Sequence, residues 1–230
     1  MHKIDSNLYK KYSKAQIEEA IKIMTYKKVD PLPKTHHKDA PILYVFRHGQ
    51  SQDNANFLYS GWRDVGLTLK GRQQALDLAN KIKSIQLDLL FSSDLKRAIE
   101  TMKIAVSKNK LAKNLKINIE PRIKEKSYGD LQGKNKLEDF LQNPKSSLKI
   151  RRSFDTKANN GESVMEVCQR VAQFCDEILP LMKRYKLNVA VSCHGNSMRG
   201  FRRYFENLSD EDTATIETPL GQDYASYYVG

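Results

Sequence analysis

The sequence predicts an α/β fold with three layers, in which helices cover both faces of a mostly parallel β-sheet. Short apolar runs, typical of buried strands, alternate with longer segments whose apolar residues recur at helical spacing. These helical segments are long enough for the crossovers that parallel strands require. A chain of 230 residues with 40% hydrophobic residues suffices for one domain with its own core, or for one domain with an appendage.

Residues 1–40 are expected to form an N-terminal helical extension and linker, and residues 41–230 the main domain. Ser13 and Gln16 have capping-box spacing, which predicts the start of a helix. Apolar residues then recur at i, i+3, i+4 and i+7: Ile17, Ala20, Ile21 and Met24. This helix either packs on its own domain or serves as a docking or oligomer element, and the sequence leaves the oligomeric state open.

In the main domain, strands and helices alternate along the chain. The expected strands are residues 42–46, 87–91, 115–119, 189–193 and 224–229. The expected helices are residues 68–84, a segment starting at Ser92-Ser93-Asp94, residues 162–185, and a segment after Gly195. Residues 121–161 are expected to be irregular, with short helical pieces near 137–141 and 146–152. This order supports the parallel sheet.

Two of the predicted strands end in the same way. The first is followed by Arg47-His48-Gly49, and the strand at 189–193 by His194-Gly195. If these strands lie side by side and parallel, the two imidazoles meet at the edge where open α/β sheets bind ligands. Arg97 lies in the helix that follows another strand. Histidines with arginines, and no carboxylates spaced for a metal, suit a phosphoryl group held by fixed cations, with one imidazole as nucleophile.

The amino-acid composition limits the kinds of molecule that the protein is expected to bind. The net charge of +12 could serve nucleic acid or small anions, but the lysines are scattered and not interleaved with aromatic residues. We therefore expect a lysine-rich surface, a small anionic substrate and no nucleic acid. No apolar run reaches the length of a membrane span, so no membrane association is expected. Three cysteines without CxxC spacing indicate a reducing cytoplasm, with Cys168 and Cys175 as small core residues.

Several motifs together resemble the histidine phosphatase superfamily and, within it, the cofactor-dependent phosphoglycerate mutases. The match runs in order from about Ile42 to Tyr224. The motifs are Arg47-His48-Gly49 with Ser51 and Asn54, Ser60-Gly61-Trp62, residues 125–136 (EKSYGDLQGKNK), Arg151-Arg152-Ser153-Phe154-Asp155, Gly161-Glu162-Ser163, and His194-Gly195-Asn196-Ser197. The resemblance implies a phosphoglycerate mutase-like catalytic domain over residues 41–230.

The resemblance also implies a role for each site residue. His48 is the expected phosphorylated nucleophile and Glu125 the proton donor and acceptor. Arg47, Arg97, His194 and Asn54 are expected to hold the phosphoryl group, aided by the Gly195 N–H at a helix N-terminus. Ser51, Ser60, Gly61 and Asn196 are expected to line the phosphate pocket. Tyr128, Lys136, Arg151 and Arg152 are expected to grip a carboxylate or second phosphate at the substrate's other end.

Without the family resemblance, non-catalytic interpretations of several of these residues remain open. Glu125 lies between Lys124 and Lys126 and fits a surface ion pair. The Arg151-Arg152 pair fits a solvated charge run, and Ser51 and Asn54 fit turn-formers in a polar loop.

The expected function is a 2,3-bisphosphoglycerate-dependent phosphoglycerate mutase of glycolysis and gluconeogenesis. It would interconvert 3- and 2-phosphoglycerate through a phosphohistidine, with bisphosphoglycerate as phosphoryl primer and no metal. The alternative is a histidine phosphatase that hydrolyses small phosphate esters. Three departures from the mutase pattern bear on this choice. Lys126 and Ser127 stand where the mutases usually have arginine and histidine, and only residues 156–160 separate the Arg151–Asp155 motif from the Gly161–Ser163 motif. The tail after Tyr224 is short, so we expect no C-terminal lid that excludes water. A non-catalytic docking protein is disfavoured by the intact set of His48, Glu125 and His194.

Overall fold

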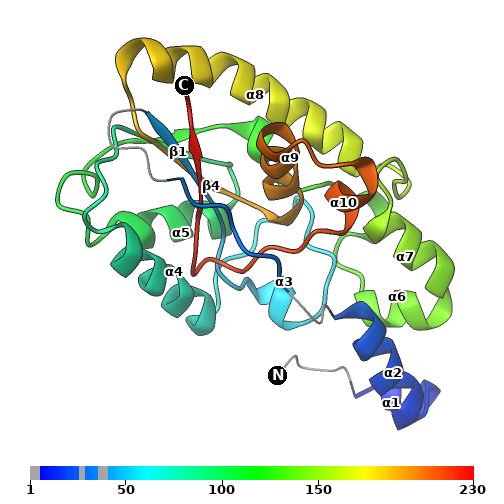
Figure 1. Cartoon of the computed structure of the whole chain (residues 1–230). Helices are drawn as coiled ribbons and strands as arrows, with labels where there is room; N and C mark the ends of the chain where they lie inside the picture. The colour runs from blue at the N-terminus through cyan, green and yellow to red at the C-terminus, as the bar shows by residue number, and fades with distance from the viewer. Residues whose placement is uncertain (1–5, 26–28, 36–40) are drawn as a thin grey trace.

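The structure is a computed structural model that describes residues 6–25, 29–35 and 41–230. Within these residues a five-stranded sheet has the strand order β3-β2-β4-β1-β5. The parallel strands are β1 (Ile42–Arg47), β2 (Leu89–Ser92), β3 (Ile117–Ile119) and β4 (Val189–Cys193). The last strand, β5 (Ala225–Tyr228), runs antiparallel to β1. The predicted, mostly parallel sheet is therefore confirmed (Figure 1).

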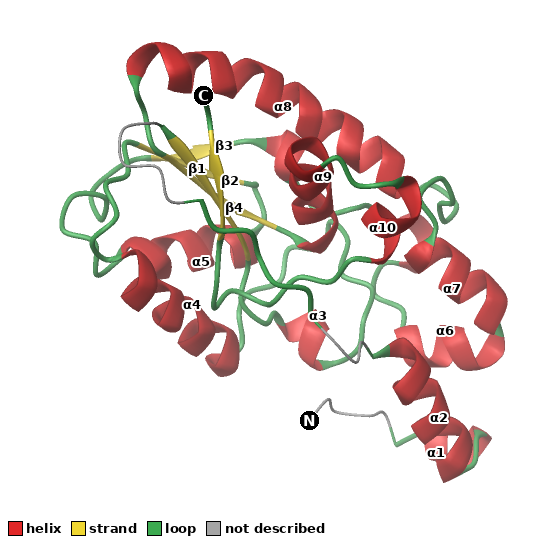
Figure 2. Ribbon diagram, viewed as in Figure 1, coloured by secondary structure: helices red, strands yellow, loops and turns green. Residues whose placement is uncertain are grey.

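Helices cover both faces of this sheet, as the sequence predicts (Figure 2). On one face lie α4 (Leu69–Ile82) and α5 (Lys96–Val106), and on the other α8 (Val164–Tyr185) and α9 (Gly195–Glu206). Side chains of β1 alternate between the two cores, because Leu43 and Val45 join the α8 and α9 side and Phe46 the α4 and α5 side. The result is a three-layer α/β sandwich.

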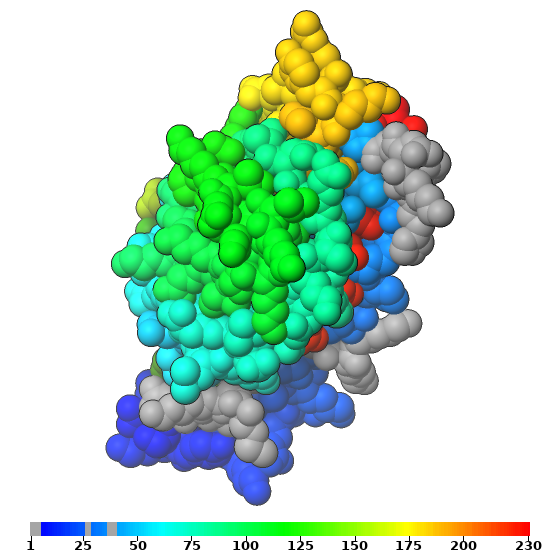
Figure 3. All heavy atoms as spheres, turned by 90° about the vertical axis from the view of Figure 1, so that its left-hand side faces the viewer, coloured from blue at the N-terminus to red at the C-terminus, as the bar shows by residue number. Residues whose placement is uncertain are grey.

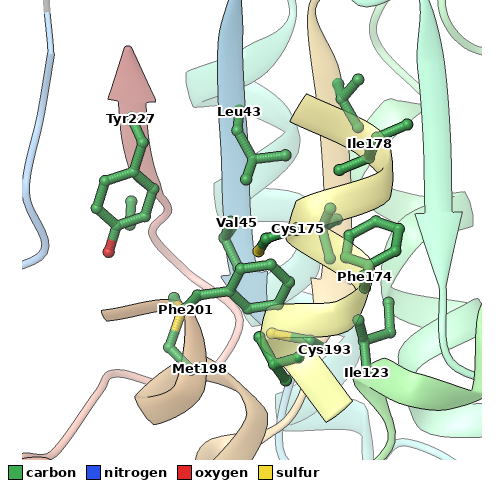
Figure 4. Close-up of a cluster of buried hydrophobic side chains, with 14 of the residues drawn as sticks. Leu43, Val45, Ile123, Phe174, Cys175, Ile178, Cys193, Met198, Phe201 and Tyr227 are labelled. Carbon is green, nitrogen blue, oxygen red and sulfur yellow. The ribbon is translucent and has the colours of Figure 1, made fainter. Parts of the chain in front are cut away.

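The larger core lies between the sheet and α8 and α9 (Figure 4). Val171, Phe174 and Ile178 of α8 are buried there at helical spacing, and Cys175 is fully buried beside them. Each such side chain contributes about 1.5–3 kcal/mol when it is removed from water. Cys168 and Cys175 are free thiols, which confirms the prediction that they are core residues.

Some predicted boundaries differ from the structure. Strand β2 begins at Leu89 rather than at residue 87, because pairing starts where the N–H groups of Asp88 and Leu89 meet the Asn188 carbonyl. Strand β3 begins at Ile117, since Leu115 N donates to a turn instead. The helix predicted to start at Ser92-Ser93-Asp94 is present, but it starts later than predicted, because Ser92 still belongs to β2. The helix α5 begins at Lys96 after Leu95, and no side chain caps it.

The remaining elements are short. The helices α6 (Lys136–Gln142) and α7 (Pro144–Arg152) confirm the two helical pieces expected within residues 121–161. Elements that the sequence analysis did not predict are α1 (Leu8–Lys11), α3 (Gln52–Ala55), α10 (Asp210–Thr215) and the 3₁₀ turns η1 (Pro121–Ile123) and η2 (Gly129–Leu131). Among the described residues, no helix is both long and apolar enough to cross a membrane.

The N-terminal helix α2 (Lys14–Met24) packs on the main domain. Ser13 and Gln16 form the predicted capping box. The buried face of α2 meets a cluster on α1, α6 and the loop after α3; the members are Leu8, Ile17, Ala20, Met24, Phe57, Leu137 and Phe140. Figure 3 shows the blue N-terminal segment at one end of the molecule and the yellow end of α8 at the other. Of the two interpretations of this helix, packing on its own domain describes the structure.

Candidate active site

The two histidines meet because β1 and β4 are adjacent and parallel. Arg47 pairs in register with Cys193, so the next residue of each strand lies at the same edge of the sheet. His48 N donates to the Cys193 carbonyl at 3.0 Å, and the imidazole centroids of His48 and His194 are 5.0 Å apart. Both side chains are buried. The predicted juxtaposition of two imidazoles is confirmed.

The hydrogen bonds of His48 prepare Nε2 as a nucleophile. Nδ1 lies 2.6 Å from the Gly49 carbonyl, which can only accept, so Nδ1 carries the proton. Nε2 keeps its lone pair and accepts from Arg97 Nε at 3.3 Å. Burial and the nearby charge of Arg97 hold the pKa of His48 well below its usual value. The imidazole is therefore neutral at neutral pH, as a nucleophile must be.

His194 is oriented by Ser93, which was expected at the start of a helix. Ser93 Oγ lies 2.7 Å from His194 Nε2 and also accepts from Leu95 N at 3.3 Å. Burial, then the charge of Arg97, lowers the pKa of His194 as well. The position of Ser93 at the end of β2, next to β4, was the signal that could have identified it.

Arg97 is fixed by the loop after α3. It is fully buried, and its Nη1 and Nη2 donate to the carbonyls of Arg63 and Gly61 at 2.8 and 2.7 Å. Gly61 has a φ of +48°, and a Cβ there would lie 2.0 Å from Gln132 Oε1. Only glycine satisfies both requirements without strain. Gly61 therefore acts through its backbone, by holding Arg97.

Glu125 is buried at the N-terminus of α9. Its carboxylate accepts from Gly195 N at 3.2 Å, Asn196 N at 3.1 Å, Asn196 Nδ2 at 2.9 Å and Lys126 N at 2.8 Å. Burial raises its pKa, but these donors and the charge of Arg47 outweigh burial and lower the pKa to about 2. The alternative of a surface ion pair with the flanking lysines is wrong, because Glu125 is 8% exposed.

The other predicted phosphate-binding residues divide into two groups. Asn54, Ser60, Gly61 and Asn196 line a pocket of about 530 Å³ together with Arg47, His48, Arg97 and Glu125. Ser51 is fully buried and is not among the residues that line this pocket. Its hydroxyl accepts from Asn54 N and its own N–H donates to Asn54 Oδ1, which forms a capping box for α3. The turn-former interpretation of Ser51 therefore describes its contacts.

The remaining predicted residues line the same pocket. They are Tyr128, Lys136, Arg151 and Arg152, so the arginine pair is not a solvated charge run. Burial and the charge of Arg151 lower the pKa of Lys136 to about 7. Arg152 Nη1 donates to Glu217 at 2.9 Å, a contact that the sequence analysis did not foresee.

The substitution at Lys126 has a structural role near Tyr128. Lys126 is fully buried, donates to the Ile150 carbonyl of α7 at 2.7 Å, and lies 4.8 Å from the Tyr128 ring centroid. The Tyr128 ring packs against Tyr59 with centroids 4.9 Å apart. Lys126 thus supports both Tyr128 and the helix that carries the arginine pair.

Several buried donors of the pocket have no hydrogen-bond partner among the described residues. They are Arg47 Nε, Ser60 Oγ and Arg151 Nη1. A buried polar group without a partner costs about 1–3 kcal/mol. Arg47 directly precedes His48, whereas Arg151 lies on α7. This distribution fits a ligand with two anionic groups.

The structure also brings together three possible metal ligands. One ligand atom each of His48, Glu125 and His194 lies within 4.8 Å of the others. However, Arg97 already donates to His48 Nε2, and Glu125 accepts four hydrogen bonds. The charges of Arg47 and Arg97 also act on this group of residues. These contacts favour an anion over a metal cation here.

A neutral, buried imidazole beside buried arginine at the edge of a parallel sheet is an arrangement suited to a phosphoryl group. A family model described as histidine phosphatase superfamily (branch 1) matches residues 43–229. The chain therefore belongs to the histidine phosphatase superfamily, as its motifs predict.

Relatives with assigned names agree on the family. The 2,3-bisphosphoglycerate-dependent phosphoglycerate mutase of Cytophaga hutchinsonii is 35% identical over 182 residues, which cover 79% of this chain and 84% of the relative. The protein of the same name from Chlamydia trachomatis serovar L2 is 32% identical over 214 residues, which cover 82% and 94%. The solved structure of a mycobacterial glucosyl-3-phosphoglycerate phosphatase has a TM-score of 0.72 at 23% identity, covering 81% of this chain and 92% of that one. This last likeness shows the shared fold.

Proposed function

We propose that this protein is a 2,3-bisphosphoglycerate-dependent phosphoglycerate mutase that interconverts 3- and 2-phosphoglycerate through a phosphohistidine at His48. The observation that carries the proposal is the pocket itself, which is lined by His48 and by Arg151, whose Nη1 has no hydrogen-bond partner among the described residues. A phosphoglycerate has a phosphate for the first and a carboxylate for the second. The names of the two relatives support the same substrate.

In the proposed mechanism, 2,3-bisphosphoglycerate is the phosphoryl donor that primes His48. Nε2 attacks the phosphorus in line, the bond from phosphorus to the substrate oxygen breaks, and Glu125 protonates the leaving oxygen. Glu125 can hold that proton because the negative phosphoryl group, once bound, raises the pKa of the carboxyl group. Arg47 and Arg97 stabilise the charge on the transferred oxygens.

In the second half-reaction, the ionised Glu125 takes a proton from the free hydroxyl of a bound phosphoglycerate. That oxygen attacks the phosphorus, and the bond to Nε2 breaks. His48 returns to its neutral form, so atoms and charges balance over the cycle. Arg151 and Arg152 hold the carboxylate, so that either the 2- or the 3-oxygen can face His48.

A histidine phosphatase that hydrolyses small phosphate esters is the second candidate. The observation in its favour is the hydrogen bond from Arg152 to Glu217. The Glu217 carboxylate offsets part of the positive charge that would otherwise bind a carboxylate of the substrate. A phosphatase transfers the phosphoryl group from His48 to water and needs no carboxylate clamp. In either case we propose a small anionic phosphate as partner and the cytoplasm as the location.

A coupled assay decides between the candidates. It supplies 3-phosphoglycerate with and without 2,3-bisphosphoglycerate, with a chelator present throughout. We expect primer-stimulated, chelator-resistant formation of 2-phosphoglycerate. Release of inorganic phosphate without isomer would move the protein to the phosphatases.

The matched control is His48→Ala, which should abolish isomer formation and covalent labelling by a radioactive phosphoryl donor. Activity retained by this variant would contradict the phosphohistidine mechanism. Arg152→Ala should reduce mutase turnover far more than hydrolysis of p-nitrophenyl phosphate, which lacks a carboxylate. Equal losses on both substrates would mean that the carboxylate clamp is misassigned.

A further inference from the structure

A carboxylate lies among the arginines that line the pocket. Glu217 Oε1 accepts from Arg152 Nη1 at 2.9 Å and from Arg199 Nη2 at 3.0 Å. The side chains of Glu217, Arg152 and Arg199 are 17%, 20% and 7% exposed, so water screens the contacts only weakly. Without the carboxylate, the two guanidinium groups would repel each other. Glu217 therefore holds both arginines in place.

Glu217 is held in turn by the N-terminal extension. Glu217 N donates to Asp30 Oδ2 at 3.0 Å, and Asp30 N donates to the Glu217 carbonyl at 3.0 Å. This reciprocal pair joins positions that are 187 residues apart in the chain. Each such hydrogen bond contributes about 1 kcal/mol net. The two together fix the backbone from which the Glu217 side chain extends.

The same extension forms part of the pocket wall. Met24, Thr25 and Val29 line the pocket, and the Met24 carbonyl accepts from Arg151 Nη2 at 3.5 Å. The extension thus contacts Arg151 directly and reaches Arg152 through Glu217. Both arginines of the expected carboxylate clamp depend on it for their position.

Arg199 also has an anchor outside this segment. Its Nε donates to the Ile216 carbonyl at 3.0 Å, but that carbonyl belongs to the same peptide group as the Glu217 N–H that Asp30 holds. Its Nη1 donates to Asn196 Oδ1 at 3.0 Å, and Asn196 in turn donates to Glu125. Because Arg199 keeps the contact with Asn196, displacement of Glu217 should disturb Arg152 more than the reacting centre at His48.

We propose that Asp30 and Glu217 are positioning residues for the substrate's second anionic group. Asp30 fixes Glu217, Glu217 fixes Arg152, and the N-terminal extension thereby sets the affinity for ligands that carry a carboxylate as well as a phosphate. The inference rests on the proposed function, because it assumes a ligand with two anionic groups. It assigns Met24, Thr25, Val29 and Asp30 a role in the selection of ligands, in addition to any role in folding.

The test measures binding in a His48→Ala background, where no turnover occurs. The probes are 3-phosphoglycerate and inorganic phosphate, titrated by calorimetry into the parent and into Asp30→Ala, Asp30→Asn and Glu217→Ala versions. Asp30→Ala should raise the Kd for 3-phosphoglycerate by about tenfold, which corresponds to the loss of one or two net hydrogen bonds. The Kd for inorganic phosphate should stay unchanged. Asp30→Asn keeps an acceptor oxygen and should restore most of the affinity, and Glu217→Ala should behave like Asp30→Ala.

The outcomes separate the inference from the proposed function. Ile23→Ala, on the exposed side of α2, is the control and should leave both Kd values unchanged. A parent that binds 3-phosphoglycerate, with variants that bind it equally well, would overturn the inference alone. Parallel weakening of phosphate and 3-phosphoglycerate would overturn it too, since it would indicate a general structural role. A parent that binds phosphate but no 3-phosphoglycerate would overturn both.

Discussion

Glu125 shows how neighbouring residues determine what a side chain can do. Two lysines flank it in sequence, yet its carboxylate turns inward to the start of α9 and accepts from the backbone of three residues. These contacts favour the ionised form over the protonated form, although burial acts in the opposite direction. The same contacts orient the carboxylate beside His48. They give the proposed proton carrier a defined charge before any ligand binds.

The pH dependence of stability tests this environment. Because folding lowers the pKa of Glu125 from 4.5 to about 2, the folded state binds fewer protons than the unfolded state between these values. The stabilisation is therefore present above about pH 4.5 and is lost as the pH falls towards 2. Glu125→Gln cannot titrate, so its deficit in unfolding free energy relative to wild type should shrink by about 2 kcal/mol between pH 5.5 and 3.

Urea unfolding at the two pH values measures this deficit. Glu18→Gln, at an exposed position of α2, is the matched control and should show no such change. A deficit for Glu125→Gln that is the same at both pH values would contradict the assigned environment.

At the scale of secondary structure, the sequence identifies elements better than it identifies their partners. The strands that carry His48 and His194 could be predicted, because each is an apolar run with the same ending, and adjacency follows from the parallel pattern. The contact of Ser93 was missed because a serine just before a helix has the same local signature whether its hydroxyl bonds to its own segment or to a histidine from another strand. Local sequence does not distinguish these two uses.

Contacts between residues that are distant in the sequence could not be predicted for the same reason. The hydrogen bonds of Glu217 come from Asp30, Arg152 and Arg199, which lie in three separate parts of the chain. Nothing in the spacing around Glu217 points to any of them. The pair Arg151-Arg152 could be identified by resemblance, but Glu217, the carboxylate that contacts Arg152, could not.

The packing of α2 gives a prediction at this scale. Ile17 is fully buried against the main domain, so Ile17→Ala should lower the free energy of unfolding by about 2–4 kcal/mol if the helix unfolds together with that domain. Ile23→Ala, at a position that is 48% exposed, should cost less than about 0.5 kcal/mol. Chemical denaturation followed by circular dichroism and tryptophan fluorescence measures both.

The two probes also reveal the opposite case. A helix that opens by itself would lose circular dichroism in Ile17→Ala while the fluorescence transition, reported by Trp62, stayed where it is in wild type. That result would make the extension a separate unit and would remove the structural basis for its role in the pocket.

For the whole molecule, charge is the dominant property. The cations of the pocket converge from β1, α5, α6, α7 and α9 and belong to a chain with a net charge of +12. Lysines such as Lys110 and Lys113 are exposed and do not line the pocket. A field produced by all these charges acts on an anionic substrate before contact, whereas the pocket cations act after it.

Ionic strength separates these two contributions. The Debye length falls from about 30 Å at 0.01 M salt to about 8 Å at 0.15 M, so distant lysines act only at low salt. We expect kcat/KM for 3-phosphoglycerate to fall by about tenfold over this range, and less for p-nitrophenyl phosphate, which carries fewer charges. The double variant Lys110→Glu and Lys113→Glu should lower kcat/KM at 0.01 M and leave it unchanged at 0.15 M, because neither residue lines the pocket. If the double variant matches wild type at both concentrations, the pocket cations alone account for the salt effect, and the excess of surface lysine plays no part in substrate capture.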